Sequence, residues 1–346
     1  MNIQCLRVLV ACSVVSMLAL TAAVSVGETV TAPKTYPPNS KSNPLPPTFA
    51  DVAYGKHARN KLDFWQAASE TPFDGAQGRP TPVIMILHGG GWMAGSKGNV
   101  SRSPRFPNLR AILGEGISVV AIDYRLIGKH TEGATPPVKA TLHDAARAVQ
   151  FVRSKAREWN INKERIASYG NSAGGCSSLW LAYHDDMADP KSEDPVARES
   201  TRLWCAAGSG AQTTLDPRQL QEWFSKPGYG GHAFGKYEYG KDFEKFLADR
   251  EKLLPWIAEY SPFALVSTGD PPVYLSYGNK PPAQGLGPDS THGVTFGVGL
   301  QKRCAELGVE CHVVYPGAPS VKYKSPIQYL VATLKAPTPH QRKFPK

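Results

Sequence analysis

The sequence has few of the residues that hold metals and redox centres. It contains six cysteines in 346 residues, and two of them fall in the first 27 residues. The remaining four are Cys176, Cys205, Cys304 and Cys311. They form no CxxC pair and no Cys/His cluster, so the pattern predicts no metal site and no cofactor. Four cysteines can pair in three ways, and the spacing does not choose among them.

Acidic residues are also scarce relative to basic ones, with 29 Asp and Glu against 39 Lys and Arg and a formal charge of +10. Part of this excess lies at the two ends, in Arg7 and in a basic tail over residues 337–346. No run of Lys and Arg is interleaved with aromatic residues, as a nucleic-acid interface would require. The composition therefore favours a mildly basic, solvated surface and no nucleic-acid partner.

The N-terminus is typical of a targeting segment. Arg7 precedes an apolar run over residues 8–26, which contains small residues suited to cleavage at Thr21-Ala22-Ala23. We expect residues 1–27 to be a signal peptide, and the mature protein to be secreted or periplasmic without stable membrane insertion. A single membrane anchor and a lipoprotein signal ending at Cys12 are the less favoured alternatives. Residues 28–48 are Pro-rich and are expected to form a linker.

Short apolar runs then alternate with amphipathic stretches over residues 49–336. Strands are predicted at 83–87, 117–122, 165–169, 202–207, 273–277 and 311–315. Helices are predicted at 142–159, 295–307 and 327–334. This alternation predicts one α/β domain with a mostly parallel central sheet, helices on both of its faces, and an active site at the carboxyl ends of the strands.

Residues 215–260 interrupt the alternation. They contain many aromatic residues among many charges. We interpret this stretch as a lid-like insertion over the site, and a surface excursion with its own small core is the equal alternative.

A pentapeptide after the strand at 165–169 carries the first chemical signal. Gly170-Asn171-Ser172-Ala173-Gly174 is a GxSxG motif between a strand and a helix expected near Gly175. This context is that of a nucleophile elbow, in which small residues two positions either side of Ser172 allow a tight turn that exposes its hydroxyl. Ser172 is therefore the candidate nucleophile.

A glycine triplet follows the strand at 83–87, in His88-Gly89-Gly90-Gly91-Trp92. Such glycines let backbone N–H groups approach a substrate and stabilise the oxyanion of a tetrahedral intermediate. We expect His88 itself to be structural rather than a base.

These motifs resemble the carboxylesterase and lipase family of α/β-hydrolases, in its hormone-sensitive-lipase-like and feruloyl-esterase-like branch. Further matching segments are Asp123-Tyr124-Arg125-Leu126, 144–148, Ser261-Pro262 and 270–273. The resemblance implies an α/β-hydrolase fold and a secreted serine esterase. It also implies an oxyanion hole formed by Gly90, Gly91 and Ala173.

The same resemblance places the catalytic acid in the loop after the strand at 273–277. Asp289 is the only acid there, and a helix-capping role is its alternative. The family's histidine follows the last strand, but this position reads Ser320, which cannot act as a base. His292 is the best substitute because it lies three residues after Asp289 in the same loop. Other histidines, such as His232 on a loop, and Lys322 or Lys324 with a lowered pKa, are further alternatives.

Three functions follow from these alternatives. The first is a serine hydrolase that acts on a small-molecule or polysaccharide-linked ester through Ser172, His292 and Asp289. The second is a binding protein on the same scaffold, favoured by the departure at Ser320 but not by the intact elbow. The third is a peptidase or another acyl hydrolase, because a fold does not determine the substrate.

Overall fold

The computed structural model describes residues 37–68 and 79–337, except residues 105, 132, 239 and 320. The predicted signal peptide, most of the basic tail and Ser320 therefore lie outside the described residues. Within the described part of the chain, no helix is both long enough and apolar enough to span a membrane.

The domain is built around an eight-stranded sheet in the order β1-β2-β4-β3-β5-β6-β7-β8. The strands are β1 (Phe49–Ala53), β2 (Lys61–Trp65), β3 (Thr81–Leu87), β4 (Ser118–Ile122), β5 (Ile161–Asn171), β6 (Cys205–Ser209), β7 (Val273–Ser276) and β8 (Cys311–Val314). From β4 to β8 all neighbours are parallel, whereas β1 and β2 pair antiparallel at one edge. The carboxyl ends of six strands therefore lie along one side of the sheet.

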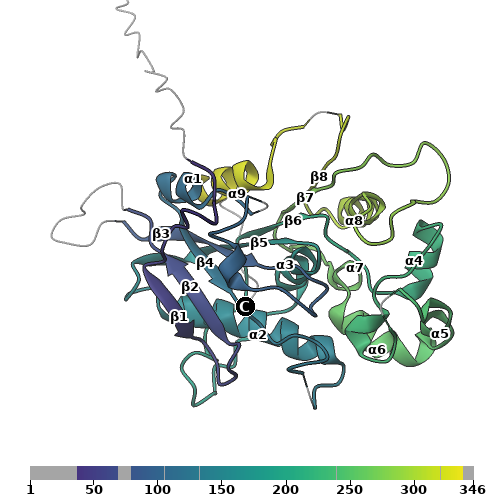
Figure 1. Cartoon of the computed structure of the whole chain (residues 1–346), viewed down its shortest axis with the longest axis horizontal. Coiled ribbons are helices and arrows are strands. Elements are labelled where there is room, and N and C mark those ends of the chain that lie inside the picture. The colour runs from purple at the N-terminus through teal and green to yellow at the C-terminus, as the bar shows by residue number, and fades with distance from the viewer. Residues whose placement is uncertain are drawn as a thin grey trace, which may run out of the picture. The chain divides into compact units, whose positions relative to one another are not determined.

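Helices cover both faces of this sheet (Figure 1). One face carries α1 (Leu109–Gly114) and α9 (Pro326–Lys335), and the other carries α2 (Pro137–Ser154), α3 (Ala173–Tyr183) and α8 (Thr295–Glu306). The central strand β3 shows why. Its residues Val83, Met85 and Leu87 pack with α2 and α3, whereas Ile84 and Ile86 pack with α1 and α9. Successive side chains on a strand point to opposite faces, so a continuous apolar run serves two helical layers.

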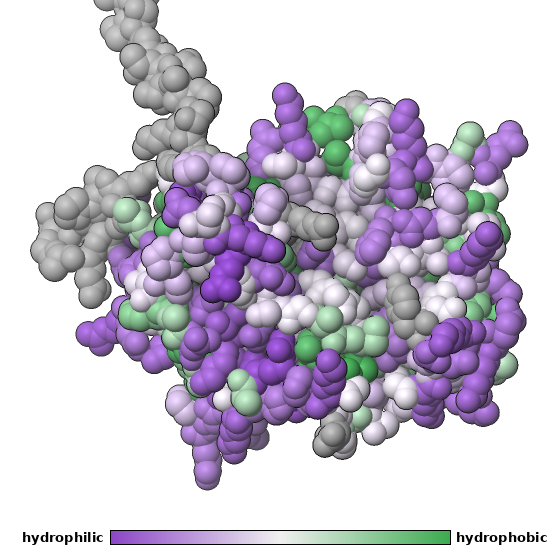
Figure 2. All heavy atoms as spheres, in the orientation of Figure 1, coloured by the Kyte–Doolittle hydropathy of each residue, from purple (hydrophilic) through white to green (hydrophobic). Residues whose placement is uncertain are grey.

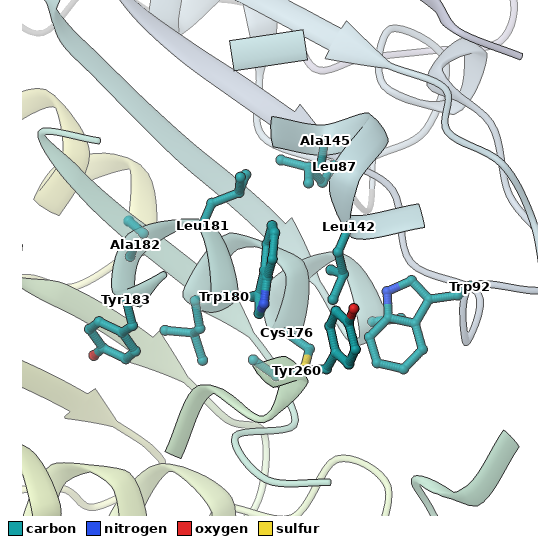
Figure 3. Close-up of a cluster of buried hydrophobic side chains, with 14 of the residues drawn as sticks. Leu87, Trp92, Leu142, Ala145, Cys176, Trp180, Leu181, Ala182, Tyr183 and Tyr260 are labelled. Atoms are coloured by element: carbon teal, nitrogen blue, oxygen red, sulfur yellow. The ribbon is translucent and has the colours of Figure 1, made fainter. Parts of the chain in front are cut away.

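The core beneath the site is centred on α3, which is buried along its whole length. Trp180 and Cys176 of this helix lie among side chains from other elements, including Leu142 of α2 and Tyr260 (Figure 3). A helix that is apolar on all sides needs such complete enclosure. The helix that follows Ser172 is consequently fixed by packing on every side.

The predicted insertion is largely helical. It contains α4 (Pro217–Trp223), the short 3₁₀ helix η2 (Gly231–Phe234), α5 (Phe243–Ala248) and α6 (Arg250–Tyr260), followed by α7 (Pro262–Leu265). The helices α4, α5 and α6 lie together, on the side of the domain away from β1 and β2 (Figure 1). Its buried aromatic residues, such as Phe234 and Phe246, pack against one another and join the main core. Hydrophilic side chains cover most of the face shown in Figure 2, with small apolar patches between them.

The elements expected from the sequence are present, but three expectations need correction. Strands β1 and β2 were not predicted, because charged residues interrupt the apolar pattern of both. The helix predicted at 142–159 begins earlier, at Pro137, where proline suits a first turn, and it ends at Ser154. We also expected ordered structure to start near Phe49. Residues before it already pack on the domain, since the buried Asn39 donates hydrogen bonds to the carbonyls of Val100 and Pro107.

Candidate active site

Ser172 stands at the turn between β5 and α3 in a strained conformation. Its φ is +52° and its ψ is −126°, a region that residues with a β-carbon rarely adopt. Its N–H donates to the carbonyl of Ser209, at the end of β6, over 2.9 Å. The turn therefore depends on the neighbouring strand, and it leaves the side chain only partly buried.

The glycines of the motif are required by close backbone contacts. A β-carbon on Gly170 would lie 2.2 Å from the carbonyl of Gly174, and one on Gly174 would lie 2.2 Å from the carbonyl oxygen of Leu87. No real β-carbon tolerates such distances, so both positions must be glycine. This is the packing that the sequence predicted for a nucleophile elbow.

The structure brings His292 to Ser172 across 120 positions of sequence. The imidazole Nε2 lies 2.9 Å from the Ser172 Oγ, a normal hydrogen-bonding distance. The ring packs over Gly210, which has a φ of +55°, and a β-carbon there would lie 3.4 Å from the His292 Cδ2. A serine hydroxyl paired in this way with an imidazole is the arrangement that general-base activation requires.

Asp289 does not contact the imidazole ring as a catalytic acid would. Its Oδ1 accepts hydrogen bonds from the backbone N–H groups of Thr291 and His292, over 2.8 Å and 2.9 Å. Its carbonyl accepts from Gly293. Throughout the described residues, no carboxylate is hydrogen-bonded to the ring of His292. These bonds are those of a local cap, the alternative role expected for Asp289, and they shape the turn that carries His292.

The glycine loop after β3 contains three consecutive residues with positive φ, at Gly90 (+104°), Gly91 (+58°) and Trp92 (+60°). The Gly90 carbonyl accepts hydrogen bonds from Met93 and Ala94, over 3.0 Å and 3.1 Å. The N–H groups of Gly90 and Gly91 donate none of the backbone hydrogen bonds found in the described loops. These donors, together with the first N–H of α3 at Ala173, remain available for a ligand.

Buried side chains hold this loop in place. Trp92 is fully buried, and its indole N–H donates to the hydroxyl of Ser177 on α3 over 2.9 Å. His88 stacks on Tyr124 with ring centroids 4.1 Å apart, and burial lowers its pKa to about 4. His88 is therefore neutral near pH 7 and lies inside the scaffold, in agreement with its expected structural role.

Two other possible bases, Lys322 and His312, do not fit. The pKa of Lys322 is raised by its contact with Tyr323, which is opposite to the lowering that a basic lysine needs. The ring of His312 packs against Tyr329 on α9 and hydrogen-bonds Glu310. The described chain also shows no group of three His, Cys, Asp or Glu residues that would hold a metal ion. Its four cysteines form no disulfide, and the Cys304 thiol lies 3.6 Å from the hydroxyl of Tyr183.

Two positioning residues near His292 escaped the sequence analysis. Gly210 packs against the imidazole ring of His292. The buried Gln212 donates a hydrogen bond from its Nε2 to the carbonyl of Thr291. Both follow the strand β6, which the apolar pattern predicted only weakly and three residues too early. The sequence Gly208-Ser209-Gly210 at the end of this strand is the signal that indicates a close backbone approach.

Two open hollows adjoin the loop that contains the glycine triplet and Met93. One, of about 500 Å³, is lined by the glycine loop, Asn171 and polar residues that include Lys41 and Ser103. The other, of about 540 Å³, lies between Met93, Ile127 and the insertion residues His232 and Tyr237. Both are within the size range of small-molecule sites. A small ligand has room beside this loop.

The fold and this arrangement of Ser172, His292 and the glycine loop define the chain as an α/β-hydrolase. The chain belongs to the BD-FAE family, whose model matches residues 73–283, about three fifths of its length. The matched stretch includes the glycine loop and the elbow and ends before Asp289 and His292. The family model therefore does not extend to His292, or to Ser320 at the position where the family's histidine is expected.

Several known proteins with similar sequences are esterases. Carboxylesterase NlhH of Mycobacterium tuberculosis is 35% identical over 101 residues, which cover 29% of this chain and 28% of that protein. Esterase LipI of the same organism is 32% identical over 124 residues and covers 36% of each chain. This chain thus spans about a third of the length of these curated relatives.

Among solved structures, the esterase Est2 of Thermogutta terrifontis has a TM-score of 0.54 at 21% identity, and the match covers 76% of this chain and 79% of Est2. At these identities the likeness establishes the α/β-hydrolase fold.

Proposed function

We propose that this protein hydrolyses carboxylic esters with Ser172 as the nucleophile and His292 as the general base. The observation that carries the proposal is the 2.9 Å contact between the Ser172 Oγ and the His292 Nε2, next to a glycine loop with free N–H donors. The family membership and the esterase relatives support the same chemistry.

The proposed reaction has two halves. The Ser172 Oγ attacks the ester carbonyl carbon while its proton passes to the His292 Nε2. The carbonyl oxygen becomes an oxyanion, which accepts hydrogen bonds from the N–H groups of Gly90, Gly91 and Ala173. When the intermediate collapses, the imidazolium returns the proton to the departing alcohol oxygen. Water, activated by the same imidazole, then attacks the acyl-serine and releases the carboxylic acid.

In this mechanism the base is oriented without a carboxylate on its ring. Asp289 caps the turn, Gln212 holds the Thr291 carbonyl, and Gly210 supports the ring face. These contacts act on the backbone and on the ring packing of His292. The pair Ser172 and His292 therefore forms a catalytic dyad, and Asp289 is a positioning residue.

We further propose that the substrate is a small ester or an ester on a polysaccharide, and that the mature enzyme acts outside the cytoplasm. The two hollows beside the glycine loop have room for a small acyl or alcohol group. The export signal in residues 1–27 lies outside the described residues, so the second proposal rests on the sequence alone.

The test is hydrolysis of 4-nitrophenyl acetate by the mature protein and by Ser172→Ala and His292→Ala. We expect the wild type to turn over the ester and each variant to lose at least about 10³-fold in kcat. Unchanged activity in Ser172→Ala would contradict the proposed nucleophile. Activity retained in His292→Ala alone would leave the nucleophile but assign the base elsewhere.

A further inference from the structure

The segment that precedes β1, residues 37–48, forms a strap that is tied to the domain through one buried side chain. This side chain is Asn39, which is 4% exposed. Its amide nitrogen donates to the carbonyls of Val100 and Pro107 over 2.9 Å and 2.8 Å, and its Oδ1 accepts from the N–H of Leu109 over 3.2 Å. Because the amide is satisfied both as a donor and as an acceptor, it anchors the strap at this point.

Lys41 follows the anchor by two residues and lines the hollow of about 500 Å³. The same hollow is lined by Gly89, Gly90 and Asn171, the residue that precedes the proposed nucleophile. These residues are in close contact, since a β-carbon on Gly89 would lie 2.7 Å from the carbonyl oxygen of Asn171. The Lys41 hollow therefore extends from the strap to the residue before Ser172.

The charge in this hollow is unbalanced. Lys41 is the one Lys, Arg, Asp or Glu among the described residues that line it, and none of the ion pairs between described residues includes Lys41. Asp123 lies 3.7 Å from the Nε2 of the lining residue His88, but its carboxylate is already paired with Arg59 at 3.3 Å. The hollow thus offers a positive charge to an anionic ligand.

The second hollow beside the glycine loop has the opposite character. Its lining includes the apolar side chains of Met93 and Ile127, and its charged residue is Glu238, which is paired with Lys241 over 2.6 Å. A negatively charged group would meet a carboxylate in this hollow and an ammonium group in the other. The charge on a substrate would therefore direct it to the Lys41 hollow.

We propose that the Lys41 hollow binds a carboxylate carried by the substrate, so that the enzyme prefers anionic esters to neutral ones. This inference rests on the proposed function and adds a substrate class to it. The carboxylate belongs either to the acyl group or to the alcohol group of the ester, and matched substrates distinguish the two. Lys41 is exposed, so salt should weaken the preference.

The test compares kcat/KM for two pairs of esters that differ in charge. 4-Carboxyphenyl acetate and 4-carbamoylphenyl acetate differ on the alcohol side, whereas mono-4-nitrophenyl glutarate and its methyl ester differ on the acyl side. In the wild type at low salt we expect the anionic member of at least one pair to be favoured by about fivefold, the upper range for an exposed ion pair. The ratio should fall towards 1 in about 0.5 M NaCl.

Variants of Lys41 assign this preference to its charge. In Lys41→Glu the ratio of anionic to neutral kcat/KM should fall by roughly tenfold, because attraction is replaced by repulsion. In Lys41→Arg it should stay within about twofold of the wild type, because the charge is kept. Asn39→Ala removes the anchor of the strap and should lower the ratio by about threefold.

Lys163→Glu is the matched control. It makes the same change in net charge at an exposed lysine near the amino end of β5, whereas Ser172 follows the carboxyl end of that strand. We expect both the ratio and the rate on the neutral esters to stay within about twofold of the wild type, because a charge so placed is screened from the site.

Three results would overturn the inference while leaving the proposed function intact. They are the absence of a preference for the anionic ester in both pairs, a ratio in Lys41→Glu equal to that of the wild type, and an equal fall of the ratio in Lys163→Glu. A wild type that hydrolyses none of the four esters would overturn both.

Discussion

The two sides of the candidate site are built in different ways. On one side Ser172 lies in a strained turn enclosed by the sheet and α3, with glycines that admit no other residue. On the other side His292 is exposed on a loop, where a cap from Asp289 and the packing over Gly210 hold it. A strained nucleophile needs surrounding structure that enforces its conformation, whereas a base needs only to be placed within hydrogen-bonding distance. The proposed base can therefore lie in a loop other than the one after the last strand without disturbing the fold.

The largest effect on kcat is expected at the contact between Ser172 and His292. Ser172→Ala and His292→Ala should each lower kcat by at least about 10³-fold, and the double variant should lose little more than either single variant, because the pair acts as a unit. Steady-state hydrolysis of 4-nitrophenyl acetate measures all three. Losses that multiply in the double variant would show that the two residues act independently.

The second prediction compares a glycine from each side. Gly174→Ala forces a β-carbon against the carbonyl oxygens of Leu87 and His88, and we expect it to lower the free energy of unfolding by about 3 kcal/mol. Gly285→Ala, in the loop that leads to His292, meets no atom within 4 Å and should cost about 1 kcal/mol for its φ of +74°. Urea unfolding measures both. Equal losses of unfolding free energy in the two variants would contradict the claim that the Ser172 side is enclosed and the His292 side is exposed.

The third prediction concerns pH. Burial lowers the pKa of both His88 and His232 to about 4, from 6.5. The folded protein thus binds fewer protons than the unfolded chain between pH 6.5 and 4, so stability is lost as the pH falls through this window. From pH 7 to pH 5 we expect a loss of about 2 kcal/mol for each histidine.

Denaturant unfolding at the two pH values, in the wild type and in His232→Phe, checks this prediction. The variant should show the smaller pH dependence, since one of the two buried rings has been removed. An identical dependence would mean that His232 takes up its proton in the folded state as easily as in the unfolded chain.

The smallest effect is expected at Asp289. If it acts by capping, Asp289→Asn should keep kcat within about threefold, because asparagine caps as well as aspartate, and Asp289→Ala should lose roughly tenfold. If it instead supplied the charge that orients the imidazole, Asp289→Asn should lose about 10⁴-fold. Ester hydrolysis by the two variants distinguishes these roles.

The contrast between the two sides also explains what the sequence could predict. Ser172 and the glycine loop were found because each motif is short and its strand and helix context is local. Gly170 and Gly174 were expected to be small for the reason that the structure bears out. The oxyanion and catalytic roles themselves stay predictions until the variants are measured.

The remaining features depend on long-range contacts. His292 was a candidate only because it follows Asp289, and nothing local indicated that its ring reaches Ser172 rather than solvent. Gln212 acts through a partner 79 positions away, the carbonyl of Thr291, which no pattern in the chain connects to it. The role of Asp289 was ambiguous because a cap and a catalytic acid share the same residue type and position.

The most direct test of the account is the rate at which a fluorophosphonate labels the protein. Such a reagent forms a covalent bond with a serine that a base activates, and mass spectrometry of the digested protein locates it. We predict labelling of Ser172 in the wild type and a rate lower by at least about 10³-fold in His292→Ala. Labelling of another residue, or an equal rate in His292→Ala, would contradict the claim that Ser172 and His292 form the catalytic pair.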